Sequence, residues 1–102
     1  MNLNEACEAV ADLFEAVPET WSTMTNARNA DGEPVSTCDP TAESFCVRGA
    51  LAAAMNISPV DANFLLRPAA DKLFGLSPAL VNDTLGRLAA IRLLREAAKC
   101  QK

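Results

Sequence analysis

The chain of 102 residues contains no histidine, and this absence removes most of the familiar catalytic chemistry. A serine or cysteine nucleophile usually needs a histidine as its base, and histidine is also the commonest ligand of catalytic metals. The four glycines stand singly at positions 32, 49, 75 and 86, so the sequence has no glycine-rich phosphate loop. We therefore predict that the protein is not an enzyme.

Cysteine is present four times, but no two cysteines form a Cys-x-x-Cys pair that would supply ligands for structural zinc. Cys7 and Cys46 fall at apolar helical positions, where they are expected to be buried as small hydrophobic residues. Cys38 and Cys100 are the candidates for exposure. Because no secretion signal precedes them, we expect free thiols rather than disulfides. Since histidine and Cys-x-x-Cys pairs are both absent, we also expect no metal and no cofactor.

Aromatic residues are also scarce, at 5% of a chain that is 50% hydrophobic. The core must therefore be built mainly from leucine, valine and alanine, a composition that favours helix over strand. No apolar run approaches the roughly 18 residues of a membrane span. We predict a single cytoplasmic all-α domain over residues 1–102, a compact bundle of four to five helices.

The stretch around which we expect this bundle to form is a central, alanine-rich helix over residues 40–55. Asp39 is its predicted cap, and Pro40 suits the first helical position because a proline lacks the N–H that would be unpaired there. Gly49 marks a point where a neighbouring element could approach closely. Before this helix, the turn-forming pair Asp31-Gly32 predicts a short β-hairpin near residues 25–36.

Four further segments carry local helix signals. The first helix is predicted over 2–17, with a capping box formed by Asn2 and Glu5. The third begins after Ser58, and Pro68 inside it predicts a kink or two short helices. A short segment follows Ser77, and the last helix is expected over 84–99. Apolar side chains expected to point inward from the later helices include Val60, Phe64, Leu65, Leu85 and Leu88.

Charge is distributed unevenly along the chain. Residues 1–45 hold nine acids and one base, whereas residues 46–102 hold four acids and eight bases. Five of the acids recur every three or four residues along the first helix and just beyond it, which predicts one acidic ridge: Glu5, Glu8, Asp12, Glu15 and Glu19. Two interpretations are open, a solvated face paired with bases of other helices, or a surface that recruits a basic partner.

Trp21 is the only tryptophan and follows this ridge directly. It is expected either to anchor the irregular segment 21–37 to the core or to contribute to a binding surface. We therefore take it, with the five acids of the ridge, as a candidate partner-binding residue.

Three blocks of sequence resemble a family of small bacterial and phage proteins that is described only as a domain of unknown function. The first joins Trp21 to the run Ala27-Arg28-Asn29-Ala30-Asp31-Gly32-Glu33-Pro34-Val35. The second is Phe45-Cys46-Val47-Arg48-Gly49-Ala50-Leu51, and the third is Asn82-Asp83, after which this chain departs from the pattern. The resemblance implies phage or bacterial relatives and supplies no activity or catalytic residues.

These observations predict a non-catalytic protein-binding module whose acidic surface fits a partner with a basic surface. In size and composition the chain is similar to phage-type inhibitors of nucleic-acid-handling host complexes, such as anti-CRISPR proteins. The alternative is a small helix-turn-helix-like DNA-binding regulator with Gly75 at the turn, using Arg87, Arg92 and Arg95 of the basic C-terminal half. A homodimer is a further possibility, in which the acidic first helix of one subunit faces the basic last helix of another.

Overall fold

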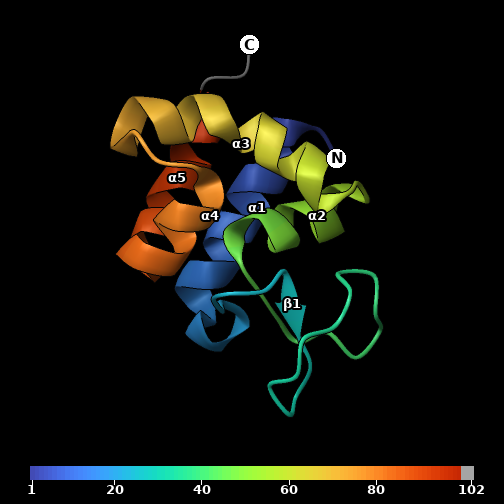
Figure 1. Cartoon of the computed structure of the whole chain (residues 1–102). Helices are drawn as coiled ribbons and strands as arrows, with labels where there is room; N and C mark the ends of the chain where they lie inside the picture. Colours follow the sequence, from blue (N-terminus) through green and yellow to red (C-terminus); the bar gives the residue numbers. More distant parts are fainter. Residues whose placement is uncertain (100–102) are drawn as a thin grey trace.

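The structure, a computed structural model that describes residues 1–99, is a helical bundle with one very small sheet (Figure 1). Its elements in chain order are α1 (Leu3–Ala16), the 3₁₀ turn η1 (Pro18–Thr20), β1 (Ala27–Arg28), β2 (Ser44–Phe45), α2 (Val47–Met55), α3 (Pro59–Phe74), α4 (Pro78–Leu80), the π-helical turn η2 (Val81–Leu85) and α5 (Arg87–Lys99). The predicted all-α class with a short hairpin is confirmed.

Helices α1 and α5 pack along one another, α2 packs on α1 and α3, and α3 lies across the top of the bundle in Figure 1. The core is mostly aliphatic, as the composition predicted, with one large aromatic ring, that of Phe14, fully buried. Many of the other buried residues are alanines, whose small side chains let the helices approach closely. The largest fully buried aliphatic side chains are Leu51, Leu66, Leu93 and Leu94.

Helix α1 begins as its local sequence predicts. The side chain of Asn2 accepts the N–H of Glu5 at 2.8 Å, and the carboxylate of Glu5 accepts the N–H of Asn2 at 3.0 Å. The two bonds satisfy two amide groups that the first turn would otherwise leave unpaired. The helix ends before Pro18, so its predicted limits are confirmed to within a residue.

Helix α2 begins seven residues later than predicted, at Val47 rather than at Pro40. Asp39 does accept the N–H and the hydroxyl of Thr41, at 2.8 and 2.7 Å, but these bonds close an isolated turn. The chain then runs extended because the N–H of Glu43 donates to the carbonyl of Arg28, in the neighbouring strand, at 2.8 Å. Cys46 caps the helix instead, its sulfur accepting the N–H of Gly49 at 3.4 Å.

The segment between α1 and α2 projects from one end of the bundle (Figure 1). Its strands pair antiparallel, Ala27 with Phe45 and Arg28 with Ser44. Within it the chain reverses at the predicted turn, where Gly32 has a φ of +81°, and a bridge forms between Arg28 and Pro34. A hairpin therefore forms where it was predicted, but the longer pairing is with residues 44–45.

Helix α3 runs without interruption through Pro68, so the predicted possibility of two short helices is wrong. Its buried face is made of Ala62, Leu66, Ala69 and Ala70. Val60, Phe64 and Leu65 were expected to point inward, but all three side chains are exposed, that of Phe64 by 62%. The three lie off the narrow alanine face by which α3 packs.

The last predicted helix is not continuous from residue 84 to residue 99. Gly86, with a φ of +94°, separates the π-helical turn η2 from α5, which begins at Arg87 rather than at residue 84. This break changes which side chains face the core. Leu85 and Leu88 were expected inside but are exposed, Leu88 by 71%, whereas Leu94, which was also expected inside, is fully buried, as is Leu93.

Candidate partner-binding site

Three of the five predicted acidic residues are brought together by one arginine of the last helix. Nη1 of Arg95 lies 2.8 Å from Oε1 of Glu8, and Nη2 lies 2.9 Å from Oδ1 of Asp12. Nη2 also contacts the carboxylate of Glu15. These four residues form the Arg95 cluster, which joins the outer face of α1 to α5. The two helices that were expected to attract one another between subunits are thus paired within one chain.

The Arg95 cluster keeps an excess of negative charge at the surface. It contains three carboxylates and one guanidinium, and the side chains of Glu8, Asp12 and Glu15 are 53%, 71% and 57% exposed. The hydrogen bonds that Arg95 donates to Glu8, Glu15 and Asp12 raise its pKa, so the guanidinium stays charged. Exposed pairs of this kind contribute only about 0.2–1 kcal/mol each, so a basic partner could displace them at little cost.

The other two residues of the predicted ridge lie outside the cluster. The carboxylate of Glu5 closes the capping box at the start of α1, although the residue is exposed. Glu19 lies on η1, beyond the end of α1, and is exposed. The ridge on α1 therefore runs from Glu5 through the Arg95 cluster, and Glu19 lies beyond it, where it lines a hollow together with Asn29 and Glu43.

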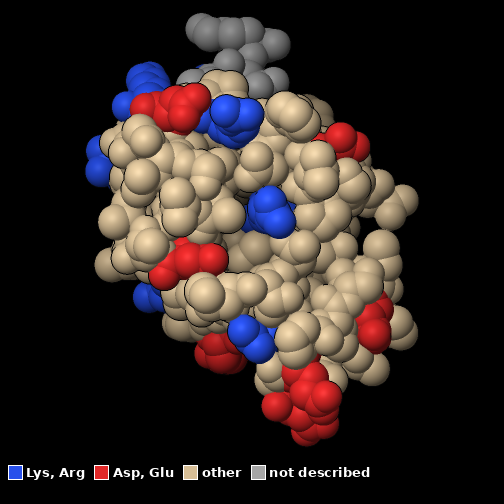
Figure 2. Space-filling model, viewed as in Figure 1, with Lys and Arg blue, Asp and Glu red and all other residues tan. Residues whose placement is uncertain are grey.

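A second group of acids was not singled out from the sequence. In the view of Figure 2, the largest group of acidic atoms lies at the tip of the segment that follows β1. Asp31 and Glu33 flank the turn at Gly32 there, and both are exposed. The helical ridge could be predicted because its acidic residues recur every three or four positions. Acidic residues in a loop have no such periodic spacing, so the group at the loop tip was not predicted.

Trp21 anchors the segment that follows α1, as one of its two interpretations predicts. Its indole Nε1 donates to Oδ1 of Asn82 at 2.7 Å, and the half-buried ring packs against the core. Asn82 is fully buried and accepts a second hydrogen bond at the same oxygen, from the N–H of Val47 at 2.9 Å. Its Nδ2 donates to the carbonyl of Ser22 and to Oδ1 of Asp83, both at 3.0 Å.

These contacts bring together the three sequence blocks that carried the family resemblance. Besides binding Asn82, Asp83 accepts the N–H of Met24 at 3.0 Å and thereby holds that residue at a φ of +73°. Gly49 lies against the backbone of Asn26, so closely that a Cβ atom at position 49 would be 1.9 Å from the Asn26 carbonyl oxygen. The predicted close approach at Gly49 is confirmed, and the residues of the three blocks fix the loop to the helices.

From the sequence, Asn82 was expected only to end a short helical segment and to belong to the Asn-Asp block, although it is the only buried polar residue among those described. The available signal was the pair Asn82-Asp83, which directly precedes residue 84, the predicted start of the last helix. An asparagine there resembles an ordinary turn residue, and its buried partners, Trp21, Ser22 and Val47, are distant in the sequence. The network holds the loop that follows η1 against α2 and η2.

The arginines of the DNA-binding alternative all make contacts inside the chain. Arg87 donates to the carbonyl of Phe14 at 2.8 Å, and the guanidinium of Arg92 lies 5.7 Å from the centre of the Phe74 ring. Arg95 belongs to the cluster on α1. The segment that would enter the major groove consists of the three-residue α4 and the π-helical turn η2. No observation favours this alternative over the acidic surface.

The cysteines lie as predicted wherever the structure describes them. Cys7 and Cys46 are buried and Cys38 is exposed, all three as free thiols, whereas the prediction for Cys100 lies outside the described residues. Burial raises the pKa of Cys7 to about 12 and also raises that of Cys46, so neither is a thiolate at neutral pH. Within residues 1–99, no group of three His, Cys, Asp or Glu residues could hold a metal ion.

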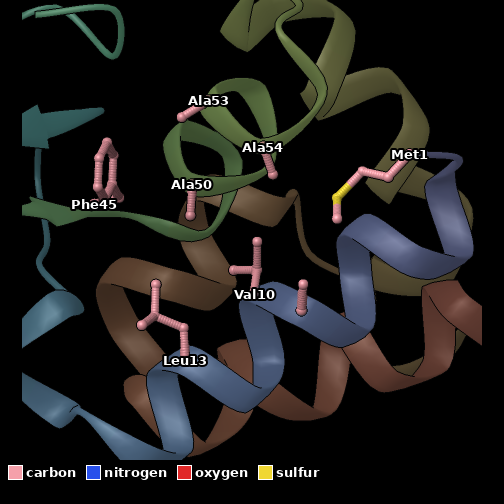
Figure 3. A pocket seen from close by; sticks show the side chains of 8 residues that line it. Met1, Val10, Leu13, Phe45, Ala50, Ala53 and Ala54 are labelled. Atoms are coloured by element: carbon pink, nitrogen blue, oxygen red, sulfur yellow. The ribbon is translucent and has the colours of Figure 1, made fainter.

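An apolar groove lies between α1 and α2 (Figure 3). Figure 3 shows Val10 and Leu13 of α1 on one wall, Ala50, Ala53 and Ala54 of α2 on the other, and the ring of Phe45 at one end. The groove has a volume of about 380 Å³. Its walls are built mostly of small aliphatic side chains.

A smaller hollow of about 280 Å³ lies beside the Asn82 network, and its lining is polar. Nε of Arg48 donates to Oδ1 of Asn26 there at 3.1 Å, and Asp83 forms part of the wall. Asp83 already accepts the N–H of Met24, and Asn26 already accepts from Arg48. We therefore assign these side chains a structural role, in which they hold the loop against the helices.

Within residues 1–99, no helix is both long enough and apolar enough to cross a membrane. Neither a protein-family model, nor a curated protein, nor a solved structure matches the chain. The resemblance to a family of unknown function therefore stays a prediction, and the geometry of the surface carries the functional argument.

Proposed function

We propose that the protein is a non-catalytic protein-binding module that contacts a basic surface of its partner through the acidic ridge on α1. The observation that carries this proposal is the Arg95 cluster, in which three carboxylates, each more than half exposed, meet a single guanidinium. A basic partner gains charge complementarity at this surface, which steers association and fixes orientation.

The class of partner that fits best is a protein that handles nucleic acid, because its nucleic-acid groove is lined by lysine and arginine. An acidic module that occupies such a groove would act as an inhibitor, in the manner of a phage anti-CRISPR protein. Glu5, Glu8, Asp12, Glu15 and Glu19 form the contact surface in this proposal. Trp21, whose indole N–H is bound by Asn82, anchors the segment that follows η1.

The test is affinity capture from a host lysate, with and without nuclease, using the wild-type protein and two charge-reversed variants. E8K/D12K reverses two residues of the ridge, and D31K/E33K makes the same change in charge at the loop tip. We expect a protein partner that survives nuclease treatment, is retained by D31K/E33K and is lost with E8K/D12K. Circular dichroism checks that both variants fold.

Two outcomes would contradict the proposal. Equal loss of the partner with both variants would indicate a response to net charge rather than to the ridge. Recovery of nucleic acid alone, abolished by nuclease, would instead favour the DNA-binding alternative, for which binding weakens steeply with added salt.

A further inference from the structure

The apolar groove and the acidic ridge share helix α1, and helical geometry brings their edges together. Ala9, which lines the groove, is four residues after Glu5 and three before Asp12. Residues at these spacings lie on the same face of a helix, with Cβ atoms about 5–6 Å apart. Glu5 and Asp12 therefore border the groove, and Asp12 is also bound to Arg95, whereas Glu8 and Glu15 face Arg95 and lie farther from the groove.

The shape of the groove suits a helical occupant. It runs between two packed helices, and alanines at positions 9, 50, 53 and 54 keep both walls low enough for another backbone to approach. Its volume of about 380 Å³ lies near the lower end of the range for ligand pockets and admits one or two bulky side chains. An amphipathic helix that presents such side chains at helical spacing is a recurring ligand of grooves of this kind.

We propose that this groove receives an amphipathic, basic helix of the partner protein. A leucine, phenylalanine or methionine of that helix enters the groove between Leu13 and Ala53. Lysine or arginine residues one turn away meet the carboxylates of Glu5 and Asp12. This inference rests on the proposed function and adds to it the chemistry of the segment that is bound.

The occupant belongs to another protein rather than to a second copy of this chain. The basic helix of this chain is α5, and its arginines at positions 87, 92 and 95 are bound to Phe14, to the Phe74 ring and to the acidic cluster. Offering α5 to the groove of a neighbour would break these contacts. A helix from a different protein, with its basic side chains unengaged, has no such cost.

Three fluorescein-labelled synthetic helices of 18 residues serve as probes. The first carries leucines at helical spacing flanked by lysines, the second has glutamates in place of the lysines, and the third has alanines in place of the leucines. We expect saturable binding of the first probe, measured by fluorescence anisotropy, and affinities about tenfold or more lower for the other two. Amide chemical-shift changes on binding should centre on Ala9, Leu13 and Ala53.

Two variants locate the binding of the first probe. Ala53→Trp fills the groove from an exposed position on α2, and Ala30→Trp places the same side chain on the exposed loop as the control. We expect Ala53→Trp to weaken binding about tenfold or more and Ala30→Trp to leave it unchanged. Equal affinity of wild type and Ala53→Trp, or stronger binding of the alanine probe than of the leucine probe, would overturn the inference.

The same variants separate this inference from the proposed function. If the captured partner is lost with E8K/D12K but retained by Ala53→Trp, the groove inference fails and the acidic surface stands. If the partner is lost with Ala53→Trp but retained by E8K/D12K, the proposed acidic contact fails, and with it the basic character assigned to the bound helix.

Discussion

The side-chain oxygen of Asn82 accepts the indole N–H of Trp21 at 2.7 Å, across a separation of 61 residues. The same oxygen accepts the N–H of Val47 at the start of α2, so one buried amide ties the loop, α2 and η2 together. A fully buried polar group with all its partners satisfied stabilises a unique arrangement, and removing it leaves several groups unpaired.

Asn82→Leu should therefore lower the free energy of unfolding by about 2–4 kcal/mol, because the Trp21 N–H, the Val47 N–H and the Ser22 carbonyl lose their partners. Urea denaturation measures the loss, and the fluorescence of the only tryptophan should report a more polar surrounding. A loss below about 0.5 kcal/mol, within the usual range of surface substitutions, would show that the network contributes little to stability.

Gly49→Ala should destabilise the protein, although alanine usually favours a helix over glycine by about 0.5–1 kcal/mol. The added methyl group would lie 1.9 Å from the carbonyl oxygen of Asn26, so the loop or the helix must shift. We expect a cost of about 1–3 kcal/mol in thermal or urea denaturation. Ala53→Gly, on the exposed side of the same helix, is the control and should cost only the ordinary helix propensity.

Arg95→Gln should lower stability by about 1 kcal/mol at low salt, since three exposed ion pairs are lost and three like charges remain on α1. The difference from wild type should shrink in 1 M NaCl, where charges are screened. Arg67→Gln, at an exposed arginine of α3, is the matched control. If the proposed function holds, Arg95→Gln should also bind the basic partner more tightly, because the ridge becomes more negative.

The buried thiol of Cys7 should make stability fall at alkaline pH. Its pKa is about 12 in the folded protein and 9.0 without burial, so the unfolded chain releases this proton first as pH rises. The contribution is fully present below pH 9 and is lost progressively towards pH 12. Urea denaturation at pH 8 and pH 10.5 should show a smaller loss for Cys7→Ala than for wild type.

Cys38→Ala is the control for this measurement, because it removes an exposed thiol and leaves the buried thiol of Cys7 in place. Equal pH dependence of Cys7→Ala and wild type would contradict the assignment to Cys7. A thiol-reactive dye gives an independent check, since Cys38 should react in the folded protein, whereas Cys7 and Cys46 should react only after unfolding.

Features that depend on neighbouring residues could be predicted from the order of residues alone. Asn2 and Glu5 define the start of α1, Ser58 and Ser77 cap the segments that follow them, and Gly75 ends α3 with a positive φ. Each of these signals acts within one turn of the chain. The helical class and the acidic ridge followed from the same short-range patterns.

Features that depend on partners distant in the sequence could not be predicted in this way. Residues 40–46 carry good helix signals, but pairing with β1 draws the chain into an extended strand, and α2 begins later. Asn82 gains its role from three segments that no local pattern connects, and the ridge is partly neutralised because Arg95 comes to lie against α1. Burial and charge pairing depend on which faces meet, and that choice is made by the packing of the whole chain.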